Sequence, residues 1–234
     1  KLEFDDCVDS ELMAFIRNIH VVNMSDEERE VKLFMHQVFV ISDSHMSDTV
    51  QYEPEQKVIQ TYKGHRTFMI NGAHSDGRGF DDYSVGLFGI EGHDGTFRDA
   101  EDGMLSKNGV EHGKVDSVLG LYMTIQPQSS HRVYYWVAAG KSAREAKKVN
   151  DTILSNGALH HILTTSKWWS QWAKPAIKVS ERLPEAHQQS FVRSALLIKA
   201  QTDKHGAVIA STDTTMLNYS RDSYAYAWPR DGAY

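Results

Sequence analysis

The chain has 234 residues and a formal net charge of −6 at pH 7; 41% of its residues are hydrophobic and 24% are charged. This composition is typical of a globular protein and excludes a disordered or collagen-like chain. The acidic balance argues against nucleic acid or an anionic membrane as a partner, because both require a basic surface. The single cysteine, Cys7, excludes an internal disulfide and a cysteine-based zinc cluster.

Alternating hydrophobic and polar residues indicate β-strands through residues 1–140. In residues 12–22 the alternation places Met13, Phe15, Ile19 and Val21 on one face of a strand, interrupted by Arg17. A hairpin is expected at 57–71, with a three-residue loop at 63–65. Since no long helical pattern separates the strands, an antiparallel sandwich or barrel is predicted. The expected strands are 1–5, 12–22, 31–41, 57–62, 66–71, 83–90, 117–126 and 132–139.

A long polar, glycine-rich segment at 91–114 is predicted to be a loop. Its acidic residues Asp99, Glu101 and Asp102, followed by Gly103, carry oxygen ligands of the kind that calcium prefers. Their spacing does not match a calcium-binding helix–loop–helix, so a solvated loop without a metal is the better interpretation.

The histidines do not form a metal motif in the sequence. His160 and His161 are adjacent, so on a helix their side chains diverge by about 100° and cannot both face one ion. Three others fall in expected loops: His93, His112 and His131. No metal or cofactor is therefore expected.

Helical periodicity begins after Gly140. Ser142 and Glu145 form a capping box that opens a helix through about residue 154, and Asn156-Gly157 ends it. A second helical pattern covers 159–172, and Pro175 is expected to interrupt it.

Two further features follow in the helical part. Trp168, Trp169 and Trp172 are spaced for one buried stripe, which we interpret as a seam between domains in preference to a sugar platform. Another helix is predicted from Pro184 to about Thr202, stopped by 204–206.

The segment 219–234 is the densest in aromatic and charged side chains. Aromatic faces can stack on a pyranose ring, and Arg and Asp can bind its hydroxyls, so a monosaccharide pocket is one interpretation. The structural alternatives are that Asp231 caps a helix, that Arg230 and Asp231 form an ion pair, and that Trp228 is ordinary core.

Several strings in the chain resemble prokaryotic glucoamylases of glycoside hydrolase family 15. The resemblance implies an N-terminal β-supersandwich, a helical linker and a catalytic (α/α)6 barrel. It divides the chain into 1–140, 141–180 and 181–234, the last being the first helices of the barrel. The strings are 97–103, 133–141, 196–203, 206–210 and 221–234.

The resemblance also implies roles for individual residues. Arg230 and Asp231 would hold the outer hydroxyls of the non-reducing-end glucose, while Tyr224 and Trp228 would line the pocket near the scissile bond. The implied reaction is inverting hydrolysis of an α-glucosidic bond by two glutamates on later barrel loops. Those glutamates lie downstream of position 234, so no catalytic residue is expected in this chain and the chain alone is expected to be inactive.

The ends of the chain and its context give further expectations. The chain starts on a strand-like segment without an initiator methionine and stops as a new element begins, which suggests a piece of a longer protein. The expected partners are an α-glucan or α-glucoside and the remaining barrel. A trehalase of the same family and a non-catalytic β-sandwich module are the alternatives. The single cysteine and the prokaryotic resemblance favour the cytoplasm.

Overall fold

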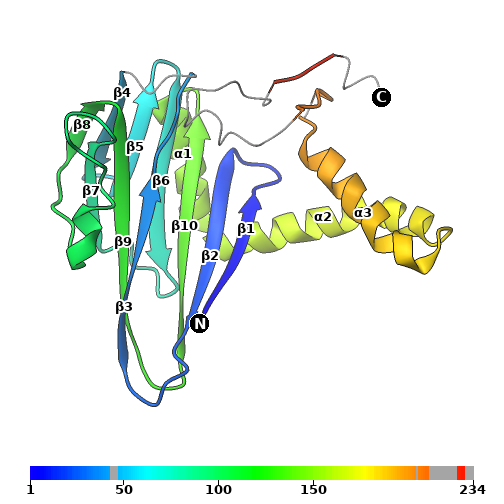
Figure 1. Cartoon of the computed structure of the whole chain (residues 1–234), viewed down its shortest axis with the longest axis horizontal. Helices are drawn as coiled ribbons and strands as arrows, with labels where there is room; N and C mark the ends of the chain where they lie inside the picture. The colour runs from blue at the N-terminus through cyan, green and yellow to red at the C-terminus, as the bar shows by residue number, and fades with distance from the viewer. Residues whose placement is uncertain (43–46, 204, 211–225, 230–234) are drawn as a thin grey trace. The chain divides into compact units, whose positions relative to one another are not determined.

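The computed structural model describes residues 1–42, 47–203, 205–210 and 226–229. It divides into two compact units, Lys1–Thr165 and Ser166–Tyr234. The first unit holds all the named strands (Figure 1). They are β1 (Leu2–Val8), β2 (Ala14–Val22), β3 (Arg29–Gln37), β4 (Asp48–Glu53), β5 (Val58–Lys63), β6 (Arg66–His74), β7 (Asp82–Leu87), β8 (Val110–Gly113), β9 (Val115–Ile125) and β10 (Ser130–Gly140).

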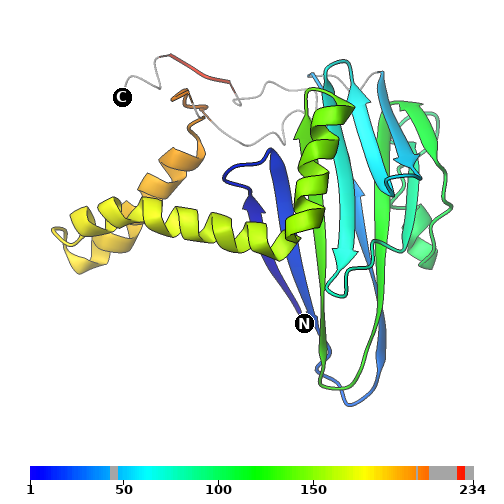
Figure 2. The same ribbon diagram turned by 180° about the vertical axis from the view of Figure 1, so that it is seen from behind.

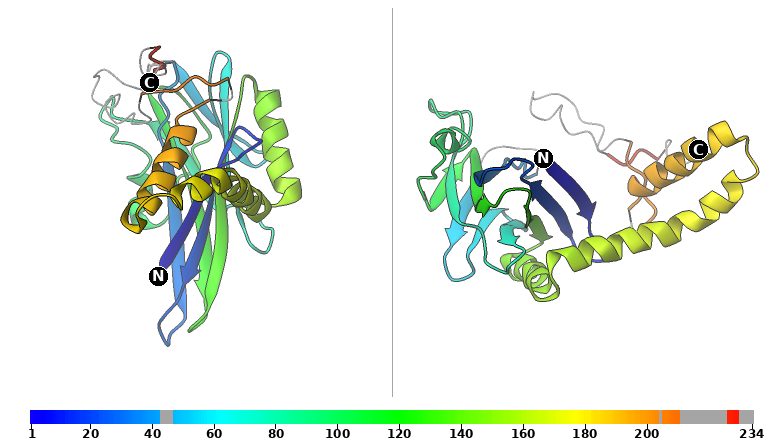
Figure 3. Two further views of the ribbon diagram at one scale, coloured as in Figure 1. Left: turned by 90° about the vertical axis from the view of Figure 1, so that its right-hand side faces the viewer. Right: turned by 90° about the horizontal axis from the view of Figure 1, so that it is seen from below.

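The strands form two antiparallel sheets that face one another (Figure 3). The larger sheet has the order β1-β2-β10-β6-β5-β4-β8, and the smaller has the order β3-β9-β7. The register is set by hydrophobic partners: Val133 of β10 lies opposite Ile19 of β2, and Leu33 of β3 lies opposite Leu121 of β9. The predicted mainly β, antiparallel sandwich is confirmed.

The core between the sheets is built by every second residue of the central strands, as the strand geometry requires. β2 contributes Ile19 and Val21, and β9 contributes Leu119 and Leu121, all at most 4% exposed. The other faces of β2, β6 and β10 are also apolar, so a further layer must cover them.

Helix α1 (Ala143–Asn156) provides that layer and lies on the outer face of the larger sheet (Figure 2). Its buried Ala146 and Ile153 pack with Ile16, Met69 and Trp136 from the strands. The predicted capping box is present: the Ser142 hydroxyl accepts a hydrogen bond from the Glu145 N–H at 3.3 Å. The helix ends at Gly157, whose φ of 85° suits glycine.

The connections β2–β3 and β9–β10 run side by side at one end of the sandwich (Figure 1). Asn23, which is 7% exposed, joins them. Its side-chain nitrogen lies 2.7 Å from the Glu27 carbonyl oxygen and 3.0 Å from that of Ile125. The buried Asn23 side chain therefore holds together the β2–β3 and β9–β10 connections, through which the chain passes from one sheet to the other.

Two more helices follow, α2 (Ala158–Ser180) and α3 (Glu185–Ala200). The expected break at Pro175 is wrong, because α2 continues through it. The proline removes the hydrogen bond to the Gln171 carbonyl, but both residues are exposed, so water can satisfy that oxygen. Pro184 is the N-cap of α3, one position before the helix.

Other local expectations are also corrected. Met13 precedes β2 and is 54% exposed, so it does not share the buried face of Phe15, Ile19 and Val21. The hairpin loop between β5 and β6 has two residues, because Lys63 pairs directly with Arg66. Strands β4 and β8 were not expected.

Among the described residues, no helix combines the length and apolar character needed to cross a membrane.

Candidate functional site

Of the four predicted glucose-binding residues, the structure describes Trp228. Tyr224, Arg230 and Asp231 lie outside the described residues, so their placement stays a prediction. Trp228 is described and is 44% exposed. A partly exposed indole can stack on a sugar ring, and the role of Trp228 stays a prediction.

A tight turn after α3 leads toward this segment. The Asp203 carboxylate accepts hydrogen bonds from the N–H groups of His205 at 2.7 Å and Ala207 at 2.9 Å. These backbone donors, Ala207 first, lower the pKa of Asp203. Gly206 completes the turn with a φ of 88°, which favours glycine.

The turn brings two of the strings that resemble the glucoamylase family together. Val208 pairs with Thr202, and Ile209 pairs with Ala227 in an antiparallel bridge. The Ala210 N–H donates to the Tyr226 carbonyl at 3.2 Å. The backbone of 206–210 therefore contacts the short described segment 226–229 that carries Trp228, although the two segments are about 20 positions apart in the chain.

The acidic loop at 91–114 is held to the small sheet by its own polar groups. Asp116 of β9 is 2% exposed, and one of its carboxylate oxygens accepts from the Thr96 N–H and from His36, each at 2.7 Å. Asp99 accepts from the Ser106 N–H at 2.8 Å, and Arg98 pairs with Glu101. In the part of the chain that the structure describes, no three His, Cys, Asp or Glu side chains are grouped to hold a metal.

A hollow of about 580 Å³ lies between this loop and β7. Much of its polar lining is already bonded: the Ser84 and Ser106 hydroxyls lie 2.9 Å apart, and the Asn108 amide donates to the Val85 carbonyl at 2.7 Å. The imidazole of His93 is the one ring among its lining residues, and no Phe, Tyr or Trp lines the hollow to offer the broad face on which a sugar stacks. We interpret it as the seam where the loop packs on the sheet.

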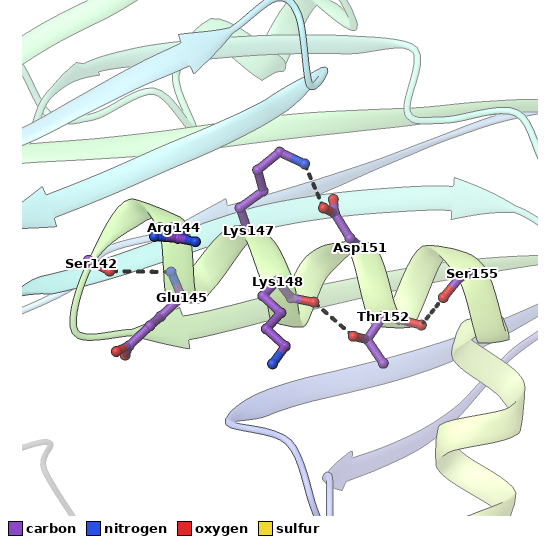
Figure 4. Close-up of a pocket in the computed structure, with 8 residues that line it drawn as sticks. All are labelled: Ser142, Arg144, Glu145, Lys147, Lys148, Asp151, Thr152 and Ser155. Carbon is purple, nitrogen blue, oxygen red and sulfur yellow. Dashed lines mark hydrogen bonds and ion pairs between the residues drawn. The ribbon is translucent and has the colours of Figure 1, made fainter.

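A second hollow, of about 880 Å³, follows the outer face of α1 (Figure 4). Its lining comes from 142–155 alone, so no second element forms an opposing wall. The side chains mostly bond within the helix, as Lys147 does to Asp151 and Thr152 to the Lys148 carbonyl. This solvated helix face lacks the enclosure that a ligand site needs.

The three tryptophans of α2 do not form a buried stripe. Trp168 is 37% exposed, and Trp169 and Trp172 are half-buried. Their rings pack edge to face along the helix, with centroids 4.9 and 6.0 Å apart. Their role as a seam between domains stays a prediction.

The histidines are placed differently from what the sequence indicated. His112 lies in β8 and His131 in β10, whereas loops were expected. His161 is 7% exposed and bonds Asp9 at 2.8 Å, while His160 is exposed, so the two diverge as expected.

Sequence reasoning missed a cluster at the end of β6, where His74 contacts His131, Arg78 and Asp81. His74 and His131 are separated by 57 positions, and no short-range spacing could have revealed their contact.

Comparison with known proteins supports the fold. No sequence profile of a protein family matches the chain, and no curated protein matches it by sequence. Among solved structures, a bacterial glucoamylase complexed with acarbose matches with a TM-score of 0.66 at 13% identity, covering 99% of this chain and 37% of that one. A putative kojibiose phosphorylase from human microbiome is 10% identical over 86% of this chain and 26% of that one, with a TM-score of 0.23.

The second likeness is too distant to support an argument, and the first shows the fold alone. The chain therefore shares the architecture of part of a bacterial glucoamylase, and it spans 37% of that protein's length.

Proposed function

We propose that this chain forms the β-supersandwich, helical linker and first barrel helices of an inverting, exo-acting α-glucosidase of glycoside hydrolase family 15. In this proposal residues 1–140 are the sandwich, 141–180 the linker and 181–234 the start of the (α/α)6 barrel. The observation that carries it is the fold likeness to a bacterial glucoamylase, which extends over 99% of the chain and thus beyond the sandwich into the helices. The string 221–234 adds the residue-level resemblance.

The proposed substrate is the non-reducing end of an α-glucan. Arg230 and Asp231 hold the outer hydroxyls of the terminal glucose through charge-assisted hydrogen bonds. Tyr224 and Trp228 line the pocket near the scissile bond. Two observations support this assignment: the Trp228 side chain is 44% exposed, and the bridge between Ile209 and Ala227 supports the backbone next to it.

The proposed chemistry requires two carboxyl groups about 6.5–9.5 Å apart, one to protonate the departing oxygen and one to activate water on the opposite face. We assign both to glutamates of the barrel downstream of position 234. The chain contributes substrate binding and no acid or base, and residues 1–234 alone release no glucose.

The bacterial glucoamylase that shares the fold is complexed with acarbose, which supports a sugar substrate for this chain. A trehalase shares the terminal glucose with a glucoamylase, so the four site residues do not separate the two.

The test uses the enzyme encoded by the complete reading frame. We expect it to hydrolyse maltotriose in preference to trehalose and to release β-glucose first, observed by NMR immediately after mixing. Release of α-glucose first would overturn the inverting mechanism, and preference for trehalose would overturn the glucoamylase assignment.

Residues 1–234 serve as the companion sample. They should release no more glucose from maltotriose than a mock purification. Hydrolysis above that background would refute the placement of the acid and base downstream. An inactive complete protein that still binds maltotriose saturably would instead support a non-catalytic module.

A further inference from the structure

Residues 75–81 carry the chain from one sheet of the sandwich to the other. β6 belongs to the larger sheet and β7 to the smaller one, so this crossover joins the two layers (Figure 1). His74, the last residue of β6, is 2% exposed. Its N–H donates to the Arg78 carbonyl at 2.8 Å, and the Ser75 N–H donates to the Arg132 carbonyl at 3.0 Å.

The hydrogen bonds of the His74 ring define its proton arrangement. Nη2 of Arg78 lies 3.1 Å from Nδ1 of His74, and a guanidinium can only donate, so Nδ1 is the acceptor. Nε2 lies 2.9 Å from the Asp81 carboxylate, to which it donates. His74 in this arrangement is the neutral ring with its proton on Nε2.

Asp81 connects the ring to the smaller sheet. Its carboxylate also accepts from the Tyr122 N–H of β9 at 2.6 Å and pairs with Arg78. Arg78 in turn donates to the Tyr122 carbonyl at 3.0 Å. The neutral His74 is therefore the link between the larger sheet and an Asp81–Arg78 pair that is fixed on β9.

His131 of β10 completes the cluster. Its Nε2 lies 3.0 Å from Nδ1 of His74, so Nε2–H donates there and shares that acceptor with Arg78. Two imidazole nitrogens at this separation hold one proton between them. If both rings were protonated, two N–H groups and two positive charges would face each other beside the Arg78 guanidinium.

We propose that His74 and His131 form a proton-sensitive clasp, which holds the 75–81 crossover against both sheets at neutral pH and releases it in acid. The device does not depend on the proposed glucosidase function.

The charged groups around the pair come from each element packed on it. The crossover provides Asp76, Arg78 and Asp81, β10 provides His131, and β9 provides the Tyr122 backbone. The pKa of His131 is lowered, first by burial and then by His74 and Arg78, although Asp76 opposes this. Protonation of the half-buried His131 ring is thus disfavoured in the folded chain.

The sign follows from proton counting. The Nε2 of His131 and the Nδ1 of His74 are 3.0 Å apart, so the folded pair has room for one proton between these facing nitrogens, whereas the unfolded chain has no such restriction. The pKa of His131 is also lowered in the folded chain, so the unfolded chain protonates this ring at a higher pH than the folded chain does. The folded state is therefore destabilised progressively as the pH falls below the ordinary value of 6.5.

The test compares urea unfolding of the full chain at pH 7.5 and 5.0 with that of the double variant His74→Gln/His131→Gln. Glutamine keeps a donor and an acceptor but does not titrate. We expect the variant to lose less stability between pH 7.5 and pH 5.0 than the parent does. The control, His65→Gln/His187→Gln, removes two exposed histidines and should keep the acid effect. Equal acid sensitivity of the His74/His131 variant and the parent would refute the clasp.

If the double variant does not fold, two measurements on the parent chain test the proposal instead. NMR titration of the two imidazoles should show at most one proton taken up by the pair at pH 5.0. Hydrogen exchange, corrected for intrinsic rates, should show the Ser75 and Tyr122 amides losing protection in acid more than the Ile19 amide in β2. Two protons on the pair with an unchanged, protected crossover would overturn the proposal.

Discussion

The side chain of Asn150 is the polar contact through which α1 is fixed on the sandwich, and removing it gives a quantitative test of the packing. Asn150 is 1% exposed, and its side-chain oxygen accepts from Trp136 Nε1 at 2.9 Å and from Asn71 Nδ2 at 3.1 Å. Asn150→Ala leaves both donors buried without this partner, at about 1–3 kcal/mol each. The better helix propensity of alanine offsets about 0.5 kcal/mol. We expect a net loss of about 2–5 kcal/mol.

Urea unfolding followed by far-UV circular dichroism measures this loss. The control is Thr152→Ala, a partly exposed position on the same helix, which should change stability by less than about 0.5 kcal/mol. In a Trp136→Phe background one donor is already absent, so the cost of Asn150→Ala should fall by about 1–2 kcal/mol. A loss below 1 kcal/mol, or the same loss in both backgrounds, would refute the reasoning.

Three smaller predictions concern the backbone. At Gly140 a Cβ would lie 2.5 Å from a backbone nitrogen of α1, so Gly140→Ala should cost about 1–3 kcal/mol in urea unfolding, whereas Gly109→Ala, with open space around it, should cost less than 1. Pro175→Ala restores a helical hydrogen bond in α2 and should raise the free energy of unfolding by about 1–3 kcal/mol. The melting temperature should rise with it, and an unchanged melting curve would contradict this. Asp203→Ala should speed amide exchange at Ala207, whereas Asp203→Asn keeps an acceptor for that N–H and should speed exchange less; equal exchange in both variants would contradict the assignment. Because the pKa of Asp203 is lowered in the folded chain, the turn should weaken as the pH falls below 3.8.

The main features of the fold were predictable because they depend on local patterns. The alternation of residue types identifies β2 and β9 as strands of a sheet. The capping box at Ser142 and the glycine at position 157 define the two ends of α1 closely. β8 was not predictable, because four residues inside a glycine-rich loop carry too little pattern. Pro175 misled because the sequence does not show that its site on the helix is exposed to water.

The candidate site was predictable to a smaller extent. The density of aromatic and charged residues at 219–234 predicts a binding segment, and this stays a prediction; of the four proposed site residues, Trp228 is described and is 44% exposed. The support from 206–210 depends on the turn at Asp203, whose geometry is not evident from residue types alone. The His74–His131 contact depends on strand order, since β10 lies beside β6 in the sheet although 57 positions separate the two residues.

The central claim is that the Trp-Pro-Arg-Asp string binds the terminal glucose. It is tested most directly by kcat/KM on maltotriose for the complete enzyme carrying Arg230→Lys/Asp231→Asn, with Arg221→Lys/Asp222→Asn as the matched control nine positions upstream. Each lost charge-assisted hydrogen bond is worth about 1.5–3 kcal/mol, so the first variant should lose at least about 100-fold and the control less than about threefold. Equal kcat/KM for the Arg230/Asp231 variant and the parent would contradict the account.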